Sequence, residues 1–348
     1  MKYGILTFHN IPNIGALLQA YGLCTTIRKL GAECDLIDYQ CDNIIYRELT
    51  FHPAVGFWRN VLAKYIWRKT ERKIKSCQYF MKQQNFYSKK LYTKKNIGEA
   101  NKDYDAFISG SDMIWNLFVT GNDFTYFLDF VNEDKPKYSY ASSVGAEWDC
   151  NTLCNVQPLL YKYNSVSVRE YDTCRIINDM GIPCKHVVDP TMLLTRDEWA
   201  KIALPPKEKD YVLVYFPTKE NKQAALDYAK RHGKKVLMIN MWLFSPGFKN
   251  VSPMDPPSWL GYFMKASAVF TDSYHGILFS LYFQKPFWTG NYGNRILSLI
   301  NTLGLQGCLL KNDRDLINEI DYRLVDEKLH KLRIDSYNFI KNQILNKS

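Results

Sequence analysis

The sequence lacks a long hydrophobic run. No stretch approaches the roughly 20 consecutive apolar residues that a membrane-spanning helix needs. Met1 leads directly into a strand-like segment, and no charged and then apolar leader precedes it. We therefore expect a cytoplasmic protein that does not cross a bilayer.

The sequence also lacks the cysteine spacing of a zinc site. Its nine cysteines are scattered, and the one close pair, Cys150 and Cys154, has neither a second pair nor a nearby histidine to complete a tetrahedral site. We expect reduced thiols, no bound metal and no cofactor.

Acidic residues are the scarcer charged class. The 45 Lys and Arg exceed the 35 Asp and Glu, which gives a formal net charge of +10 and a pI near 9.0. This balance suits an anionic partner such as a phosphorylated small molecule, a membrane surface or nucleic acid. With 348 residues, of which 46% are hydrophobic, the chain can bury a sizeable core, and its length favours two domains.

Strand-like and helical segments alternate along most of the chain. We expect strands at 2–8, 34–38, 106–109, 138–142, 165–170 and 186–188, and again at 211–215, 236–239, 268–271 and 286–288. Proline and charge cluster at 204–210, which predicts an interdomain linker. The alternation is typical of parallel sheets. It predicts an α/β protein with Rossmann-like domains at 1–203 and 204–315 and a helical segment at 316–348.

The segment 268–283 predicts a buried strand that runs directly into a helix. Asp272 and Ser273 are favoured N-cap residues, and His275 falls in the first helical turn beside Gly276. Unpaired N–H groups and the helix dipole favour an anion at such a junction. Considered alone, His275 is more typical of a capped structural residue than of a catalyst.

Polar loops follow strands of the first half as well. They contain Asn13, Gly15, Gly110, Ser111, Asp112, Trp115, Asn116, Arg169 and Glu170. Ser111 and Asp112 offer oxygens to sugar hydroxyls, Trp115 offers an apolar face, and Arg169 has a planar fork suited to carboxylate or phosphate. The alternatives are that Asp112 caps a helix, that Trp115 belongs to the core, and that Arg169 pairs with a nearby acid.

Residues 46–102 differ in character from the rest of the chain. Basic residues alternate with bulky apolar ones, namely Arg59, Lys64, Arg68, Lys69, Arg72, Lys73 and Lys75 with Trp58, Leu62, Tyr65, Ile66 and Trp67. The pattern predicts a basic amphipathic helical insertion, which either forms a solvated cover or contacts the inner face of an anionic membrane. No nucleic-acid-binding pattern accompanies the charge, so we do not expect nucleic acid as a partner.

These loops resemble motifs of the polysaccharide pyruvyl transferase family. Residues 272–276 (Asp-Ser-Tyr-His-Gly) are similar to the family's Asp-Ser-Phe-His-Gly signature, and residues 110–116 match its Gly-Ser-Asp-x-x-Trp-Asn. Further matches in family order are Asn-x-Gly at 13–15, Ala-x-Ser-x-Gly at 141–145, Val-Arg-Glu at 168–170 and Asp-Pro-Thr at 189–191.

The resemblance covers residues 2–287 and implies a GT-B-like pair of Rossmann-like domains facing a cleft. It implies transfer of the carboxyvinyl unit of phosphoenolpyruvate to two hydroxyls of a sugar, in a cell-surface polysaccharide or its precursor. The products would be a cyclic pyruvate ketal and phosphate. Whether the acceptor is soluble, nucleotide-linked or lipid-linked is left open, as is the general acid or base role of each catalytic group.

The resemblance also implies roles for individual residues. His275, Asp112 and Glu170 would be catalytic, and the substrate-binding residues would be Arg169, Ser273, Gly276, Asn13, Gly15, Ser111, Trp115 and Asn116. The first domain would form the acceptor side. Two other functions remain open: a GT-B-type glycosyltransferase that uses a nucleotide sugar, and a membrane-associated binding module.

Overall fold

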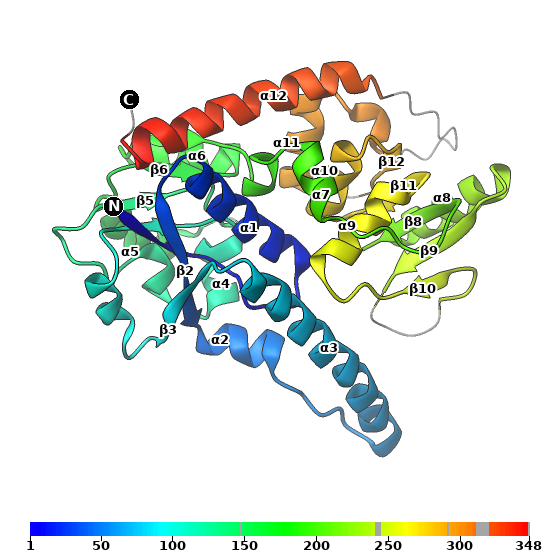
Figure 1. Cartoon of the computed structure of the whole chain (residues 1–348), viewed down its shortest axis with the longest axis horizontal. Helices are drawn as coiled ribbons and strands as arrows, with labels where there is room; N and C mark the ends of the chain where they lie inside the picture. The colour runs from blue at the N-terminus through cyan, green and yellow to red at the C-terminus, as the bar shows by residue number, and fades with distance from the viewer. Residues whose placement is uncertain (147, 241–244, 291, 311–319, 347–348) are drawn as a thin grey trace. The chain divides into compact units, whose positions relative to one another are not determined.

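The structure is a computed structural model of residues 1–348 that describes all of them except 147, 241–244, 291, 311–319 and 347–348 (Figure 1). The chain divides into two compact units. Unit 1 comprises Met1–Thr50, Cys77–Leu194 and Lys331–Ser348, and unit 2 comprises Phe51–Ser76 and Thr195–His330. The sequence predicts a boundary at 203–204, whereas the structure divides the chain after Leu194 and assigns its last segment to unit 1.

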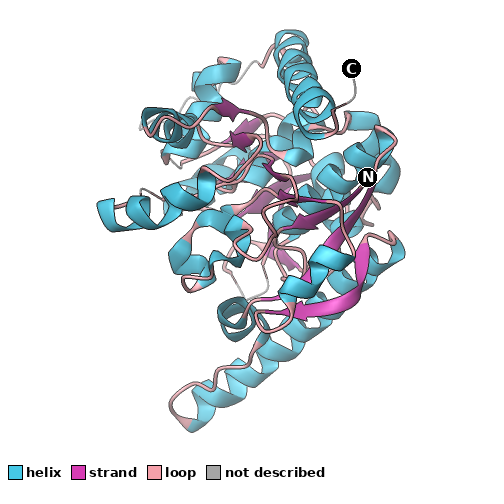
Figure 2. Cartoon of the chain, turned by 90° about the vertical axis from the view of Figure 1, so that its left-hand side faces the viewer, coloured by secondary structure: helices cyan, strands magenta, loops and turns pink. Residues whose placement is uncertain are grey.

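Unit 1 contains a five-stranded parallel sheet in the order β3-β2-β1-β4-β5. The strands are β1 (Lys2–Leu6), β2 (Glu33–Gln40), β3 (Tyr87–Thr93), β4 (Ala106–Ser109) and β5 (Lys137–Ser139). β6 (Val166–Val168) and β7 (Cys184–His186) form a parallel pair, and single bridges join β5 and Ser142 to the β6 segment. Figure 2 shows the helices of the chain in cyan and its strands in magenta.

The helices of unit 1 are short except for the first. They are α1 (Ile14–Lys29), α2 (Asp42–Ile44), α4 (Leu117–Thr120), α5 (Cys150–Leu160) and α6 (Tyr171–Asp179), with single turns at Ile45–Leu49, Ile97–Lys102, Met113–Trp115, Phe124–Phe127, Pro190–Met192 and Ile340–Ile344. α1 begins where the Asn13 side chain accepts hydrogen bonds from the next turn. It ends before Gly31, whose φ of 74° suits glycine.

Unit 2 repeats the arrangement with the order β10-β9-β8-β11-β12, again all parallel. Its strands are β8 (Tyr211–Tyr215), β9 (Lys235–Ile239), β10 (Lys249–Val251), β11 (Ala268–Thr271) and β12 (Phe287–Trp288). Its helices are α7 (Arg196–Ile202), α8 (Lys219–Arg231), α9 (Pro256–Lys265), α10 (Tyr274–Tyr282) and α11 (Asn294–Leu303), with a single turn at Gln306–Cys308.

Two long helices contribute residues to both units: α3 (Phe57–Gln83) and α12 (Tyr322–Phe339). The predicted insertion at 46–102 is helical only in part, because it also contains β3. Lys89 and Lys90 are exposed in the middle of β3, which lies at the edge of its sheet. Exposed lysines are common on edge strands, where they discourage pairing with other chains, and they hide the strand pattern here.

Both strand orders place a topological switch point beside the first strand of the unit. In unit 1 the chain passes from β1 to β2 on one side and later to β4 on the other; in unit 2, β8 lies between β9 and β11. Ligands of open parallel sheets bind outside the carboxyl ends of the strands at such points. The loops after β1, β4, β8 and β11 are therefore the candidate positions for a site.

Candidate active site

The loop after β4 packs closely against the end of β1 at the switch point of unit 1. A Cβ atom added to Gly110 would lie 2.9 Å from the Cβ of Thr7, so a larger residue would force the two segments apart. The Thr7 hydroxyl donates to the carbonyl oxygen of Ser111 at 2.8 Å. The close approach brings Ser111 and Asp112 to the carboxyl end of the sheet.

Asp112 has an unusual backbone conformation, with φ 68° and ψ −179°. This region is almost restricted to glycine, and another residue occupies it at a cost of about 1–3 kcal/mol. The carbonyl of Asp112 accepts from the Ser143 N–H at 3.0 Å, and the Trp115 N–H donates to the Ser143 carbonyl at 3.2 Å. The loop after β4 and the loop after β5 are thus bonded together around Asp112.

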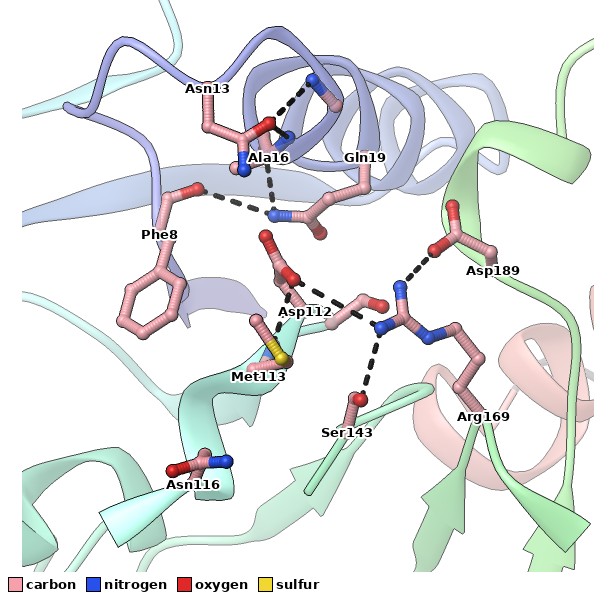
Figure 3. Close-up of polar contacts among 12 residues, drawn as sticks. Phe8, Asn13, Ala16, Gln19, Asp112, Met113, Asn116, Ser143, Arg169 and Asp189 are labelled. Carbon is pink, nitrogen blue, oxygen red and sulfur yellow. Dashed lines mark hydrogen bonds and ion pairs between the residues drawn. The ribbon is translucent and has the colours of Figure 1, made fainter. Parts of the chain in front are cut away.

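Arg169 lies in the centre of a group of carboxylates (Figure 3). Its Nη1 donates to Asp189 Oδ2 at 2.6 Å and its Nη2 to Ser143 Oγ at 3.0 Å. Its Nε lies 3.6 Å from Glu170 Oε1, and its Nη2 lies 4.0 Å from Asp112 Oδ1. The Ser143 hydroxyl in turn donates to Glu170 Oε1.

The Arg169 side chain is only 2% exposed. The ion pair that the sequence left open as an alternative is therefore present, and three carboxylates surround one cation. Direct contact between Arg169 and a phosphate or carboxylate ligand stays a prediction.

Three buried oxygens near these loops have no hydrogen-bond partner among the residues that the structure describes: Ser111 Oγ, Glu170 Oε2 and Gln19 Oε1. The Gln19 amide is fixed in orientation, since its Nε2 donates to Thr7 Oγ1 and to the Ala16 carbonyl, both at 2.9 Å. A buried acceptor without a donor costs about 1–3 kcal/mol. The loops therefore offer acceptors to a ligand that brings hydroxyl or amino hydrogens.

Asn13 and Gly15 lie at the start of α1. The exposed Asn13 caps the helix, because its Oδ1 accepts from the Gly15 N–H at 3.1 Å and from the Ala16 N–H at 3.4 Å. Nearby His9 is buried, with its Nδ1 2.8 Å from the Thr7 carbonyl and its Nε2 3.2 Å from Asp38 Oδ1. These contacts order the loop after β1, and ligand binding by Asn13 and Gly15 stays a prediction.

Trp115 and Asn116 have structural contacts. Trp115 is fully buried and stacks on Phe127 with ring centroids 5.2 Å apart, which agrees with the alternative that it belongs to the core. The Asn116 Oδ1 accepts from the Val119 N–H at 3.0 Å and so caps α4, and its Nδ2 donates to the Val144 carbonyl at 2.9 Å. The Trp115 ring therefore has no exposed face in this structure on which a sugar could stack.

Asp272 connects three loops at the switch point of unit 2. Its Oδ2 accepts from the Thr218 N–H at 2.5 Å, and its Oδ1 accepts from the Gly290 N–H at 2.7 Å and the Thr289 hydroxyl at 3.0 Å. Ser273 is the N-cap of α10, since its Oγ accepts from the Gly276 N–H at 3.3 Å. Of the two predicted cap residues, Ser273 is therefore the one that caps α10. Asp272 instead holds the neighbouring loops together through its carboxylate.

His275 is half-buried in the first turn of α10, as predicted from the sequence. The Arg295 guanidinium lies over the neighbouring Tyr274 ring, 5.1 Å from its centroid. Gly276 has a packing role, because an added Cβ would come within 2.5 Å of Thr271 Oγ1. The small residue thus lets α10 approach β11.

Sequence reasoning missed Gln19, Ser143 and Asn221. Asn221 is fully buried at the start of α8, and neither of its amide atoms has a partner among the described residues. Gln19 and Asn221 could have been noticed as amides on the buried faces of their helices. Ser143 could have been found within the motif at 141–145, but no local pattern shows that it bonds Arg169.

The described residues contain no group of three or more His, Cys, Asp or Glu side chains suited to hold a metal ion. In the same residues, no helix is both long and apolar enough to span a membrane.

The motifs found at these loops agree with a family-level comparison. The model of the family described as polysaccharide pyruvyl transferase matches residues 13–294. The chain belongs to this family. The protein is therefore a transferase, and the match includes the loops after β4, β8 and β11 together with Asn13 at the end of the loop after β1.

Solved structures similar to this pyruvyl transferase share its fold. A UDP-GlcNAc 2-epimerase from Neisseria meningitidis, bound to UDP-GlcNAc, aligns over 100% of both chains with a TM-score of 0.57 and 9% identity. A putative UDP-N-acetylglucosamine 2-epimerase from Listeria monocytogenes aligns over 100% of this chain and 97% of its own, with a TM-score of 0.55 and 10% identity. A comparison with curated proteins gave no match.

At these identities the likeness concerns the fold alone. It confirms the predicted GT-B-like class, with two Rossmann-like parallel sheets.

Proposed function

We propose that this pyruvyl transferase uses phosphoenolpyruvate to form a cyclic pyruvate ketal on a sugar of a cell-surface polysaccharide or its precursor. Two sugar oxygens form bonds to C2 of the donor, the bond from C2 to the phosphate oxygen breaks, and the methylene carbon takes up one proton to become a methyl group. The two hydroxyl protons balance this uptake and the protonation of the phosphate. The observation that carries the proposal is the family match across residues 13–294.

The charge balance of unit 1 supports a sugar ligand there. Among the residues that the structure describes, the carboxylates of Asp112, Glu170 and Asp189 surround the Arg169 guanidinium, so this group carries three formal negative charges against one positive charge, which disfavours an added phosphate or carboxylate. Hydroxyl groups would instead donate to the acceptors of this region. In this proposal Asp112 and Glu170 orient the sugar, and one of them takes up its proton.

The start of α10 supports binding of the anionic donor in unit 2. Its first backbone N–H groups and the positive end of the helix dipole favour a phosphate or carboxylate. Arg295 belongs to α11, but its guanidinium lies over the Tyr274 ring of this first turn and adds a positive charge. His275 belongs to this turn and is our proposed proton donor to the methylene carbon.

The test is incubation of the purified protein with phosphoenolpyruvate and a panel of glycans, with phosphate release and ketal formation as the two measurements. We expect phosphate release that requires a glycan. Release of nucleoside diphosphate from a nucleotide sugar, with no consumption of phosphoenolpyruvate, would show a glycosyltransferase and contradict the proposal.

His275→Ala should reduce the turnover number by about 100-fold or more, since a positioned general acid contributes at least that factor. The matched control is His330→Ala, which removes an exposed imidazole from α12 of the same unit. Near-normal turnover of a folded His275→Ala protein would remove this histidine from the mechanism.

A further inference from the structure

The first turns of α3, the helix labelled in Figure 1, expose several large apolar side chains. Phe57 is 74% and Trp58 80% exposed, and the exposed set in this region is Val55, Phe57, Trp58, Val61, Leu62 and Tyr65. Single exposed apolar residues are normal on a protein surface, but a contiguous group marks an interaction site. Residues 57, 58, 61, 62 and 65 recur at helical spacing, so they share one face of α3.

The same face becomes basic further along the helix. Arg68, Arg72 and Lys75 are exposed and follow Val61 and Tyr65 at intervals of three and four residues. The opposite face is the covered one, since Cys77 and Met81 are buried there. The exposed face of α3 therefore has an apolar half followed by a cationic half.

The charge of this segment is almost entirely of one sign. Residues 51–83 contain eight Lys or Arg and a single acid, Glu71, and so supply most of the chain's net charge of +10. A helix charged only for solubility typically mixes both signs and gains from pairs four residues apart. The scarcity of acids favours a negatively charged partner.

The partner must also accept bulky apolar groups. Phosphates of a nucleic acid would pair with the basic residues but leave Val61 and Leu62 in water. The interface of an anionic bilayer accepts both kinds of group, because Trp, Tyr and Phe settle at the level of the headgroups while Lys and Arg pair with lipid phosphates. The positive charge and the aromatic and aliphatic side chains of α3 thus both indicate an anionic bilayer as the partner.

We propose that the exposed face of α3 binds an anionic lipid surface, with Phe57, Trp58 and Leu62 entering the headgroup region and the basic half lying along it. The proposal concerns binding alone, so it stands or falls independently of the transfer reaction. Together with the proposed function, it points to an acceptor sugar that is attached to a lipid.

The test is co-sedimentation of the full-length protein with phosphatidylcholine vesicles, with and without phosphatidylserine, at low and high salt. We expect binding to the anionic vesicles that high salt weakens, and far weaker binding to the neutral ones. Equal and negligible sedimentation with both vesicles would overturn the proposal.

Two double variants locate the surface. Arg68→Gln with Arg72→Gln should weaken vesicle binding by roughly tenfold or more, and Trp58→Ser with Leu62→Ser should weaken it at both salt concentrations. The matched control is Lys230→Gln with Arg231→Gln, which removes two exposed charges from α8 and should leave binding unchanged. Equal loss in the control would show non-specific charge attraction and overturn the assignment to α3.

Two further measurements distinguish membrane binding from catalysis and from self-association. Phosphate release with a soluble acceptor should be normal in both α3 variants, so a failed transfer assay cannot be mistaken for failed membrane binding. The competing occupant of the face is a second copy of the chain. A dimer that Trp58→Ser with Leu62→Ser converts to a monomer, without any vesicle binding, would contradict the lipid proposal.

Discussion

Asp112 combines a strained backbone with a carboxylate that lies beside Arg169. Glycine would adopt its φ and ψ without strain, and a helix cap alone does not require this conformation. Strain of this kind persists where the surrounding structure enforces it and is frequent at active sites. We infer that the side chain is retained for its chemistry.

Asp112→Gly and Asp112→Ala separate the strain from the chemistry. Both lose the carboxylate, so both should lose transfer activity, but only alanine keeps the backbone strain. The glycine variant should exceed the alanine variant by about 1 kcal/mol or more in free energy of unfolding. Urea denaturation measures this difference.

The same pair of changes at Asp103 is the control. Its φ of −100° is ordinary for any residue, so there the alanine variant should be the more stable. If the alanine variant is the more stable of the two at position 112 as well as at position 103, Asp112 is not strained.

Arg169→Lys tests the central cation. Lysine keeps the charge but cannot bond Asp189 and Ser143 with one planar fork, so the free energy of unfolding should fall by about 2 kcal/mol. Thermal and urea unfolding measure the loss. An unchanged stability together with a raised KM for phosphoenolpyruvate would instead support the direct ligand contact predicted from the sequence.

At the scale of elements, buried strands were predictable and exposed ones were not. β1, β4, β8 and β11 are apolar runs covered on both faces, and the sequence predicts each within a few residues. β3 and β10 contain exposed lysines, and their strand conformation depends on a neighbouring strand that the local sequence does not reveal. The capping box of Thr195 and Glu198 at the start of α7 has its two partners three residues apart, so a local pattern is enough to recognise it.

A partly buried histidine at the end of β7 should make the stability of unit 1 depend on pH. His186 ends β7, and its Nε2 lies 3.0 Å from the Arg169 carbonyl. Burial, the largest cause, lowers the pKa of His186 below its usual 6.5, while Glu170 raises it and Lys185 lowers it further. The unfolded chain therefore binds this proton more readily than the folded one. The contribution of neutral His186 to the free energy of unfolding is therefore fully present above about pH 6.5. It is lost as the pH drops through the lowered pKa of the folded protein.

His186→Gln removes this titration while keeping an N–H donor for the Arg169 carbonyl. Between about pH 7 and pH 5.5 we expect the Tm of the unchanged protein to fall more than the Tm of this variant. Differential scanning calorimetry at several pH values measures both. Parallel curves would show that other groups cause the acid sensitivity.

At the scale of the whole molecule, each unit is assembled from segments far apart in the sequence. Unit 1 includes both the first strand and the last residues of the chain, and unit 2 includes a part of α3. Local patterns place a linker where proline and charge cluster, but they cannot show to which sheet a distant helix returns. The same distinction applies to the site. Its polar loops are local patterns and could be predicted, whereas the partners of Arg169 are distant in the sequence and only the structure shows them.

The final helical residues complete the core of unit 1. Ile340 and Ile344 are fully buried, the Tyr3 hydroxyl donates to the Ile344 carbonyl at 3.2 Å, and the Val188 N–H donates to Ser336 Oγ at 3.0 Å. The last segment thus joins β1 to the region after β7, within the unit that contains Asp112 and Arg169.

Ile340→Ala should therefore reduce the free energy of unfolding by about 2–5 kcal/mol, through lost burial and the cavity left behind. Gln343→Ala, which truncates an exposed side chain of the same helical turn, should change it by less than about 0.5 kcal/mol. Urea denaturation of the two variants gives the comparison. Equal effects would mean that the terminal helix is only loosely attached to the unit. A large loss confined to Ile340→Ala would show that the last helical segment is an integral part of the core of the unit that contains the candidate site.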